Sequence, residues 1–549
     1  MNMKWLSIGN AAESLPAHKN ISYADTTATI IYRSNGVWQI TDAMGNPGHV
    51  MYDMPESGNT SDVGAPMLVR EGVFIAIPVG KQYSHIEIVK KTDSMIDSNQ
   101  DILPVPEPTL ETEEPHYIKN DNIYNSNSIY PAVDAEFAGV ENIMGVNCVH
   151  LFIYPMHYNP MDRTVALTSD LEVQIHFEDD KAGTTGTTTK VSSYNKMSSN
   201  LILGYDEVVK PLLSESNSVL PSLLIITTDE LEYSMRIYEG KRKFLYDVDL
   251  VLTSDIYAQY PNLSKDEAIR TFLDARYQID NISYVVLGGD VDQIPTHKDS
   301  EGFASDSYYC TDGTTVLPRF VLSRFPARNR EELNGQTDIA TYYDRFYDEY
   351  KRHTAVFTSY NDSSRGYEQC KEAIAANAEN VFAVIKRYDG KYKKAEVINA
   401  IESGVSFINY RGHGSNTRWS ASNGLKNEDV EKLDVGKDTP IVLSIACDNN
   451  NIYVPECFGA CWIRKYKAVA FLGASADSYT YVNHYFDKYL WEAILVQKLS
   501  IIGDIYLWAT LKLYQNDDST YSQKNIREYM VLGDILADYL DDDSTRDKT

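Results

Sequence analysis

Two short segments of the chain each end an apolar run in a side chain that can do covalent chemistry. Residues 405–410 (VSFINY) run into RGHG, which contains His413, and residues 441–446 (IVLSIA) run into Cys447. A thiolate is a strong nucleophile, and a nearby imidazole lowers the pKa of the thiol or takes up its proton. If the fold brings His413 and Cys447 together, the pair can attack the carbonyl carbon of an amide.

The two apolar runs are predicted to be central strands of a mainly parallel sheet. Neither run alternates apolar with polar residues, and such continuous runs are typical of strands that helices cover on both faces. In open sheets of this kind the ligand crevice lies at the carboxyl ends of the strands. The sequence therefore predicts that His413 and Cys447 face one crevice.

Backbone groups beside the two residues complete the expected chemistry. Glycines on both sides of His413 allow a sharp turn and a close approach of N–H groups to a substrate. The N–H groups of Gly414 and Cys447 are candidate donors to the oxyanion that forms when a thiolate attacks a carbonyl. Taken alone, Cys447 is more simply a buried small residue and His413 a loop residue. Because both stand at a strand end, we favour catalysis for the pair.

Three further residues near the motifs are candidate substrate contacts. Trp419 follows His413 by six residues, and a large aromatic side chain at the rim of a crevice supplies contact area. Ser415 directly follows Gly414, and Asp448 directly follows Cys447. No spacing typical of a zinc site or an EF-hand is present, so the metal ligands are left unassigned.

Composition limits the class of partner. The chain has 549 residues, a formal net charge of −28 and 43% hydrophobic residues, which is enough material for two to four domains. The negative charge argues against nucleic acid and anionic membranes as partners. No apolar run has the length of a membrane-spanning segment, and the first residues lack the apolar core of a signal peptide. The six cysteines are scattered and suggest no disulfide framework.

Residues 1–180 are predicted to form an all-β domain. Short segments such as 171–177 (LEVQIHF) alternate apolar and polar residues, as strands with one solvated face do. Residues 103–108 (LPVPEP) and the acids that follow are predicted to be an extended, solvated loop. Residues 181–204, rich in Ser and Thr, are predicted to be a flexible linker.

Residues 205–542 change to alternating strands and helices, which is typical of βαβ units in a doubly wound, mainly parallel α/β sheet. Apolar runs recur from residues 223–227 to residues 468–472, with helical stretches between them. The part from residue 483 to residue 540 is predicted to be largely helical, and residues 543–549 form an acidic tail.

The motifs NYRGHGS and IACDNN resemble those of the gingipain family of cysteine peptidases, peptidase family C25 in the caspase-hemoglobinase clan. Other segments resemble the catalytic domain of that family in the same order: SYVVLGGDVDQIP (283–295), PRFVLSRFPARNREEL (318–333) and VLGDILADYL (531–540). The resemblance covers roughly residues 220–540, and more weakly the N-terminal region.

This resemblance implies a caspase-like catalytic domain with Cys447 as nucleophile and His413 as its partner. It also implies a secreted bacterial endopeptidase, located outside the cell, at its surface or in the periplasm, that cuts protein or peptide substrates. The N-terminal region would be a pro-domain that acts as an intramolecular inhibitor of a latent zymogen. The chemistry would need no cofactor, and calcium would be a structural ion.

The sequence departs from the family pattern in the loop TSYNDSSRGYEQC (358–370). Where the family has an acid that orients the catalytic histidine, the nearest match is Asn361, and an amide can also hold an imidazole. Where arginine-specific members have an acid for the substrate cation, the corresponding positions here, near Gly366 and Tyr367, are not acidic. We therefore expect a preference other than arginine. The alternative function is a catalytically impaired binding or secretion-system component on the same fold.

Overall fold

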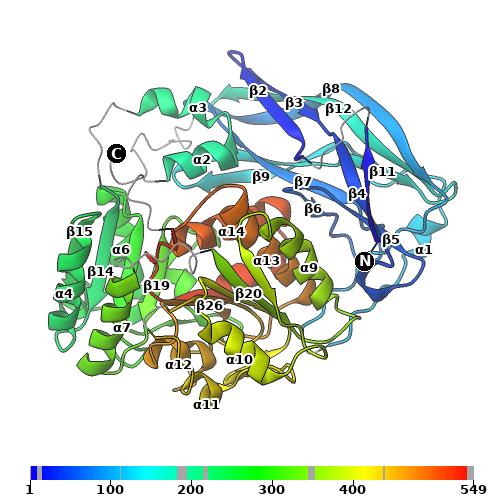
Figure 1. The fold of residues 1–549 in the computed structure, drawn as a ribbon. Helices are drawn as coiled ribbons and strands as arrows, with labels where there is room; N and C mark the ends of the chain where they lie inside the picture. The colour runs from blue at the N-terminus through cyan, green and yellow to red at the C-terminus, as the bar shows by residue number, and fades with distance from the viewer. Residues whose placement is uncertain are drawn as a thin grey trace. The chain divides into compact units, whose positions relative to one another are not determined.

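The computed structural model describes residues 2–8, 15–111, 113–181, 194–213, 220–343, 353–436 and 439–540 (Figure 1). The chain forms two compact units, each with its own apolar core. The first unit comprises residues 1–109, 114–216 and 512–522, and the second comprises residues 110–113, 217–511 and 523–549. The chain thus leaves the first unit after residue 109, contributes a short segment to the second, and returns.

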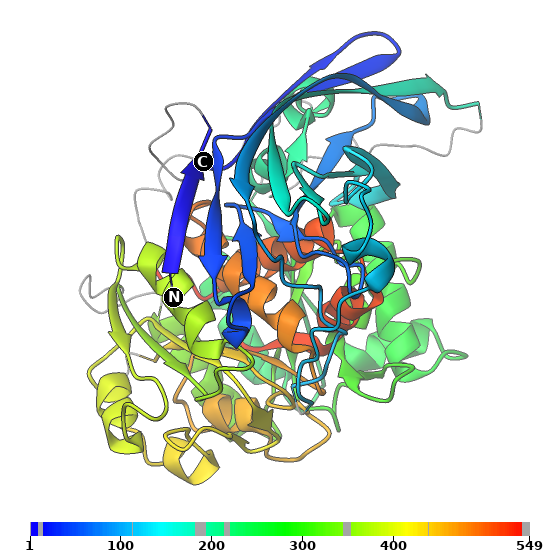
Figure 2. The same cartoon turned by 90° about the vertical axis from the view of Figure 1, so that its right-hand side faces the viewer.

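The first unit consists mostly of antiparallel sheets, whose long strands can be followed in blue and cyan in Figure 2. Strand β3 alternates buried and less buried residues, as expected of a strand with one covered face. The sheet orders are β1-β4-β5, β13-β7-β10-β9 with β6 on β7, and β11-β12-β3-β2 with β8 on β12. The strands are β1 (Asn2–Ser7), β2 (His18–Tyr23), β3 (Thr27–Arg33), β4 (Gly36–Thr41), β5 (Val50–Asp53), β6 (Gly58–Asn59), β7 (Val69–Ala76), β8 (Lys81–Ser98), β9 (Ala135–Ile143), β10 (Val146–Ile153), β11 (Met156–Asn159), β12 (Thr164–Asp179) and β13 (Ile202–Leu203).

Two short helices, η1 (Ala43–Gly45) and α1 (Asp121–Tyr124), interrupt the strands of residues 1–180, which were predicted to be all-β. The first unit also contains α2 (Asn195–Leu201), α3 (Tyr205–Val208) and η2 (Lys210–Leu212), which lie beyond residue 180. Helix α2 and strand β13, which pairs with β7, also occupy part of the predicted linker 181–204. Residues 182–193 of that linker and the acidic tail 543–549 lie outside the described residues.

The proline-rich segment after β8 is not the solvated loop that its composition predicts. Ile102 and Leu103 are fully buried, and Val105 is nearly so. The Leu103 N–H donates to the Val50 carbonyl at 2.8 Å, and the Val105 N–H donates to the Ala65 carbonyl at 2.8 Å. Prolines between these residues lack an N–H group, so the segment can pack as an edge without leaving donors unpaired.

The second unit is built on a ten-stranded sheet in the order β15-β14-β16-β19-β27-β26-β25-β22-β20-β21. Neighbouring strands in the sheet run parallel except β26 and β27, so the sheet is mainly parallel, as the sequence predicts. The strands are β14 (Ser222–Thr227), β15 (Asp247–Leu252), β16 (Tyr284–Gly288), β19 (Val321–Phe325), β20 (Thr354–Ser359), β21 (Ala383–Lys386), β22 (Phe407–Arg411), β25 (Ile441–Ile445), β26 (Ala470–Ala474) and β27 (Tyr529–Gly533).

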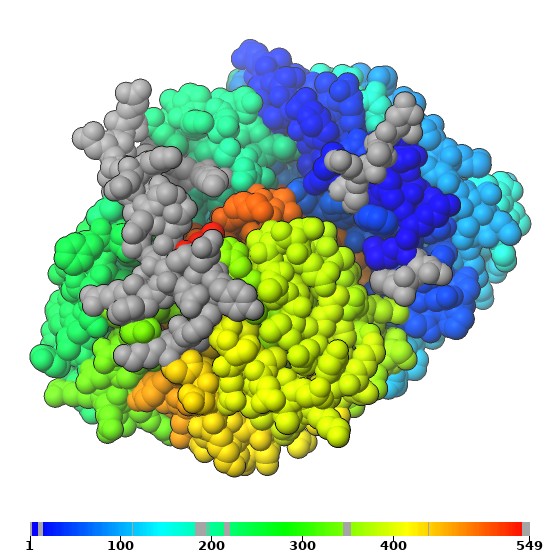
Figure 3. Space-filling model, in the orientation of Figure 1, coloured from blue at the N-terminus to red at the C-terminus, as the bar shows by residue number. Residues whose placement is uncertain are grey.

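Helices cover both faces of this sheet. Neighbouring residues of a strand point to opposite faces of the sheet, so two adjacent residues of β22 show which helices cover each face. Ile408 packs into the core that also contains residues of α10 and α12, whereas the Phe407 ring lies 5.6 Å from the Trp491 ring of α13. In the space-filling view, the yellow-green residues around α9 and α10 cover much of the near side of this unit (Figure 3).

The remaining elements of the second unit are short hairpins and the helices between strands. The helices are α4 (Glu232–Arg242), α5 (Thr253–Gln259), α6 (Lys265–Asp280), η3 (Asp306–Cys310), α7 (Arg330–Tyr343), α9 (Tyr367–Ala378), α10 (Lys394–Glu402), α11 (Asn427–Val430), α12 (Phe458–Arg464), α13 (Thr480–Leu495), α14 (Ile502–Asn516) and α15 (Thr520–Glu528), of which α14 and α15 also enter the first unit. The hairpins are β17 (His297–Lys298) with β18 (Ala304–Ser305), and β23 (Gly414–Ser415) with β24 (Arg418–Trp419).

The region from 483 to 540 is largely helical, as predicted, but it also contains strand β27, which the sequence did not predict. It pairs in parallel with β19 and antiparallel with β26, so it joins the two halves of the sheet. All five of its residues (YMVLG) are buried. A short apolar run that follows three helices cannot be told from buried helix by periodicity alone.

Candidate active site

Strands β22 and β25 place His413 and Cys447 at equivalent positions of the sheet. The two strands are parallel neighbours in which Arg411 pairs with Ile445, so His413 and Cys447 each stand two residues beyond the paired ends. Gly412 makes the turn between Arg411 and His413 with φ of +151°, and a Cβ at this position would lie 2.5 Å from the Cβ of Tyr360. Only glycine fits there without moving the neighbouring loop.

The thiol of Cys447 is buried, with 2% of the residue exposed. The Ser478 N–H donates to its sulfur at 3.2 Å, and the Ser478 hydroxyl lies 3.5 Å from it. Burial raises the pKa of Cys447 well above its usual value, and the nearby Glu111 raises it further, although the contacts with Ser478 oppose this. In this state Cys447 is therefore a neutral thiol.

The imidazole of His413 is half-buried between two tyrosine rings. Tyr360 and Tyr367 meet it edge-on, with ring centroids 4.7 and 5.6 Å away. Burial lowers the pKa of His413, and the cations of Arg365 and Arg411 lower it further against the opposing effect of Glu111. In the part of the chain that the structure describes, no hydrogen bond joins this imidazole to the Cys447 thiol. His413 is thus a neutral ring that can accept a proton.

Gly414 lies directly against the backbone of Cys447. A Cβ on residue 414 would come within 2.3 Å of the Cys447 carbonyl oxygen and 2.9 Å of the Asn449 amide. The next residue, Ser415, is half-buried, and its carbonyl accepts a hydrogen bond from Asn449 Nδ2 at 2.7 Å. The predicted oxyanion donors therefore belong to adjoining segments of backbone.

The placement of Trp419 does not support its predicted position at the rim of a pocket. Only 1% of the residue is exposed, and its ring stacks on Tyr410 with centroids 4.6 Å apart. Its indole N–H donates to Ser444 Oγ at 2.8 Å. The hairpin of β23 and β24 turns the ring inward, so it packs under β22 and β25 as part of the core.

The structure also places two other predicted site residues, Asn361 and Asp448. Asn361 is exposed, and none of the hydrogen bonds among the described residues joins it to His413; its side-chain amide would lie 2.7 Å from a Cβ at Gly390. Asp448 adopts a left-handed backbone conformation with φ of +58°. Burial raises the pKa of the Asp448 carboxyl to about 6, and the neighbouring Asp477 contributes to the shift.

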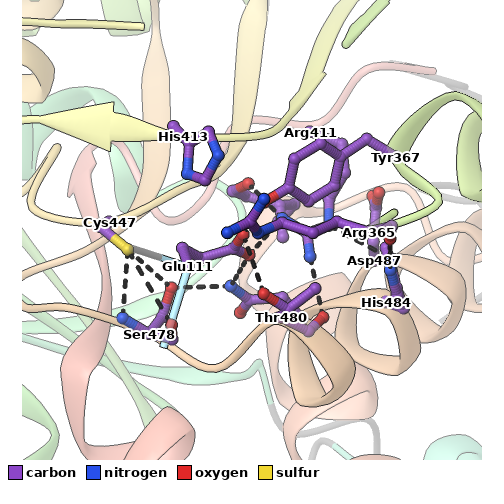
Figure 4. Close-up of polar contacts among 12 residues, drawn as sticks. Glu111, Arg365, Tyr367, Arg411, His413, Cys447, Ser478, Thr480, His484 and Asp487 are labelled. Carbon is purple, nitrogen blue, oxygen red and sulfur yellow. Dashed lines mark hydrogen bonds and ion pairs between the residues drawn. The ribbon is translucent and has the colours of Figure 1, made fainter. Parts of the chain in front are cut away.

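An acidic residue from outside the predicted catalytic region lies in the site. The segment around Glu111 belongs to the second unit and pairs as a short antiparallel strand, with Leu110 opposite Tyr479. The Glu111 N–H donates to the Ser478 carbonyl at 2.9 Å, and Ser478 is the residue that contacts the Cys447 sulfur. Figure 4 shows Glu111 beside Cys447 and below His413, with its carboxylate pointing toward Arg411.

The Glu111 carboxylate is completely buried among hydrogen-bond donors. One oxygen accepts hydrogen bonds from Arg411 Nη1 at 2.5 Å and Asn483 Nδ2 at 3.0 Å. The other accepts hydrogen bonds from Thr480 Oγ1 at 3.1 Å and from the Tyr367 hydroxyl. A carboxylate can leave water only when its oxygens are paired in this way.

Arg411, the last residue of β22, is held by groups other than Glu111. Its Nη2 donates to the Thr480 carbonyl at 2.8 Å, and its Nε donates to His484 Nδ1 at 3.3 Å. His484 Nε2 in turn donates to the Arg365 carbonyl at 2.7 Å, which fixes the neutral tautomer. Burial and the charge of Arg411 lower the pKa of His484 well below its usual value.

Sequence reasoning missed this buried cluster. Arg411 lies inside the RGHG motif, and a basic residue that ends an apolar strand is a signal that it has a partner. Glu111 stands in an acidic stretch after prolines, where nothing local distinguishes it from solvated neighbours. Its partner Arg411 is 300 residues away in the chain, so no local pattern connects the two.

Neither a metal site nor a membrane span is found in the described ranges. No group of three or more His, Cys, Asp or Glu side chains there could hold a metal ion, and no helix is both long and apolar enough to cross a bilayer. Structural calcium stays a prediction without assigned ligands.

Comparison with known proteins connects this site to a family. Peptidase family C25 matches residues 217–536, and the C25 propeptide matches residues 39–213. Gingipain R2 of Porphyromonas gingivalis is 21% identical over 496 residues, which cover 84% of this chain and 65% of that protein. The match therefore spans somewhat less than two thirds of that relative's length.

Two solved structures share the fold. The arginine-specific cysteine proteinase gingipain R aligns with a TM-score of 0.53 and 22% identity over 59% of this chain and 79% of that chain. The complex of the pro- and mature domains of RgpB from Porphyromonas gingivalis aligns with a TM-score of 0.52 and 21% identity over 58% of this chain and 79% of that chain. Because the C25 peptidase match alone covers more than half of the sequence, the chain belongs to peptidase family C25.

Proposed function

We propose that this chain is the latent precursor of a cysteine endopeptidase that cuts protein or peptide substrates with Cys447 and His413. The observation that carries the proposal is the register of β22 and β25. His413 and Cys447 each stand two residues beyond the paired ends of these strands. A neutral thiol beside a neutral imidazole can exchange a proton once a substrate is bound. Membership in a peptidase family agrees with this chemistry.

The proposed reaction passes through a thioester. His413 takes the proton of the Cys447 thiol, and the sulfur forms a bond to the carbonyl carbon of the substrate. The carbonyl oxygen becomes an oxyanion that accepts hydrogen bonds from the N–H groups of Gly414 and Cys447. The imidazolium then gives its proton to the leaving amine as the carbon–nitrogen bond breaks. Water then attacks the carbonyl carbon of the thioester while His413 takes its proton. The carbon–sulfur bond breaks, the carboxylic acid product leaves, and the imidazolium returns the proton to the Cys447 sulfur.

The segment around Glu111 is the proposed cause of latency. It pairs with residues 478–479 beside the thiol, which is where an extended substrate would have to bind. The same segment keeps the thiol protonated, because both burial and the Glu111 charge raise the pKa of Cys447. A substrate can therefore react only after this segment leaves.

The proposed division of the chain follows the predicted domains. Residues 1–180 serve as pro-domain and intramolecular inhibitor, 181–204 as linker, and 205–542 as catalytic domain. The match of the C25 propeptide to residues 39–213 supports an inhibitory N-terminal part. Export from a bacterial cell and a structural calcium ion are further proposals that rest on the family resemblance.

The test is hydrolysis of a denatured protein substrate by the full chain after limited proteolysis has released it from latency. Cys447→Ala should abolish hydrolysis, whereas Cys461→Ala, which changes another buried cysteine on α12, should leave it intact. Retention of wild-type turnover by Cys447→Ala would refute the proposed function. The absence of turnover in the wild-type chain under every activating treatment would instead favour a binding protein.

A further inference from the structure

The latent chain carries its own occupant of the proposed substrate crevice. Glu111 lies in a segment that pairs as an antiparallel strand with residues 478–479, and peptide substrates commonly bind by adding such a strand. Ser478 accepts the Glu111 N–H and also contacts the sulfur of Cys447. Glu111 is therefore the residue of the segment that stands at the nucleophile, and its side chain marks the pocket for the residue before a cut bond.

The pocket around the Glu111 carboxylate offers four hydrogen-bond donors. Arg411 and Asn483 donate to one oxygen, and Tyr367 and Thr480 donate to the other. Arg411 is fully buried, so it would be a desolvated cation without a counter-ion if the pocket held a neutral side chain. A substrate lysine or arginine would bring a second cation against it.

The donors are held in place by groups other than Glu111, so the pocket is preformed. Asn483 Oδ1 accepts hydrogen bonds from Asn525 Nδ2 at 2.8 Å and the Tyr529 hydroxyl at 2.9 Å, which directs the Asn483 amide N–H groups toward the carboxylate. Arg411 is fixed by the Thr480 carbonyl and by His484. A preformed set of donors discriminates strongly, because a ligand that lacks the acceptor leaves buried donors unpaired.

We propose that this is a specificity pocket for an acidic side chain, so that the peptidase cuts after glutamate. The inference rests on the proposed function and adds the class of substrate to it. Aspartate is one methylene shorter and cannot reach all four donors from the same backbone position, so it should be used less well.

The test uses the full chain with Glu111→Ala, which empties the pocket without truncating the protein. Peptidyl acyloxymethyl ketones that end in Glu, Asp, Gln or Arg serve as probes. The Cys447 thiolate displaces their carboxylate leaving group and forms a thioether, which peptide mass spectrometry locates. Glu107→Ala is the matched control, since it removes an exposed acid four residues before Glu111; its labelling should resemble that of the wild type.

The expected result is labelling of Cys447 by the Glu probe at least about tenfold faster than by the Asp probe, and faster still than by the Gln and Arg probes. Thr480→Val in the Glu111→Ala background keeps the side-chain shape but removes one donor, and should reduce the Glu-to-Gln ratio several-fold. The control is Thr337→Val in α7, because the Thr337 hydroxyl donates only to carbonyls of its own helix in the described residues. This substitution should leave the Glu-to-Gln ratio unchanged. Melting temperatures of all variants check that each has folded.

Two outcomes would count against the proposal in different ways. Equal or faster labelling of Cys447 by the Gln or Arg probe would overturn the acidic preference while leaving the cysteine peptidase assignment intact. Failure of every probe to label Cys447 in folded Glu111→Ala protein would overturn the proposed function, and the specificity with it.

Discussion

At the scale of single residues, the proposed nucleophile and the proposed base are both held in their neutral forms by burial. The Cys447 thiol and the His413 imidazole have pKa values shifted in opposite directions, upward for the thiol and downward for the imidazole. Both shifts disfavour the thiolate–imidazolium pair. Glu111 raises both pKa values, so its removal should lower the pKa of the Cys447 thiol and the pKa of the His413 imidazole.

Thiol reactivity tests this electrostatic description. Alkylation by iodoacetamide requires the thiolate, so the raised pKa of Cys447 predicts slow reaction at pH 7 and a rate that increases only in alkaline solution. Glu111→Ala should shift the rate profile to lower pH, because it removes an anion beside the sulfur. Mass spectrometry can follow Cys447, with buried Cys457, whose pKa is raised to about 12 by burial, as the reference in the same sample. Identical profiles for the two proteins would contradict the assigned role of Glu111.

The role of His413 is tested by a substitution that leaves the core untouched. His413→Ala should lower the turnover of the activated enzyme by about a hundredfold to ten-thousandfold, the usual contribution of a general base. Because the ring is half-buried on a loop, the melting temperature should change by no more than a few degrees. A loss of activity matched by a large loss of stability would point to a structural role instead.

At the scale of elements, the proposed active site follows from two neighbouring parallel strands, β22 and β25, that end at the same level of the sheet. The sequence predicts this part well, because the apolar runs of β22 and β25 and the residues that follow them are local patterns. The inward turn of Trp419 depends on the β23–β24 hairpin, and strand β27 depends on sheet partners distant in the chain. The contact of Glu111 with Arg411 is equally non-local. These features depend on tertiary contacts that no local pattern contains.

The turn after β22 gives a prediction at this scale. Gly412→Ala should destabilise the protein by more than about 1 kcal/mol and abolish activity, because a Cβ would lie 2.5 Å from the Tyr360 Cβ and φ is +151°. Gly240→Ala is the matched control: residue 240 lies inside α4, a Cβ there meets nothing within 4 Å, and the substitution should stabilise the helix by up to about 1 kcal/mol. Chemical denaturation of both variants measures the two effects. Equal stabilities for the two variants would contradict the described turn.

At the scale of the whole molecule, the proposed latency depends on a segment that leaves one unit and returns to it. Residues 110–113 cluster with the second unit, whereas the residues on both sides of them cluster with the first. A tethered segment of this kind occupies its site at high effective concentration. A single cut in the chain should therefore weaken the inhibition without always ending it.

Glu111→Ala tests the strength of this tether in the intact chain. Breaking a buried ion pair by removing one partner costs about 3–5 kcal/mol. The population with an open crevice, and with it the hydrolysis of a small peptide, should therefore rise by at least about a hundredfold. Glu107→Ala should have little effect, because that side chain is exposed. Equal activity of wild type and Glu111→Ala would show that the segment around Glu111 does not hold the chain latent.

The central claim is that Cys447 cuts peptide bonds and that Arg411 directs it to acidic residues. The most direct measurement is a cleavage map of a mixed peptide library, read by mass spectrometry, for the full chain with Glu111→Ala and for the same chain with Cys447→Ala added. We expect cuts that fall mainly after glutamate in the first protein and no cuts in the second. Cuts that persist without Cys447, or that fall mainly after arginine or lysine, would contradict it.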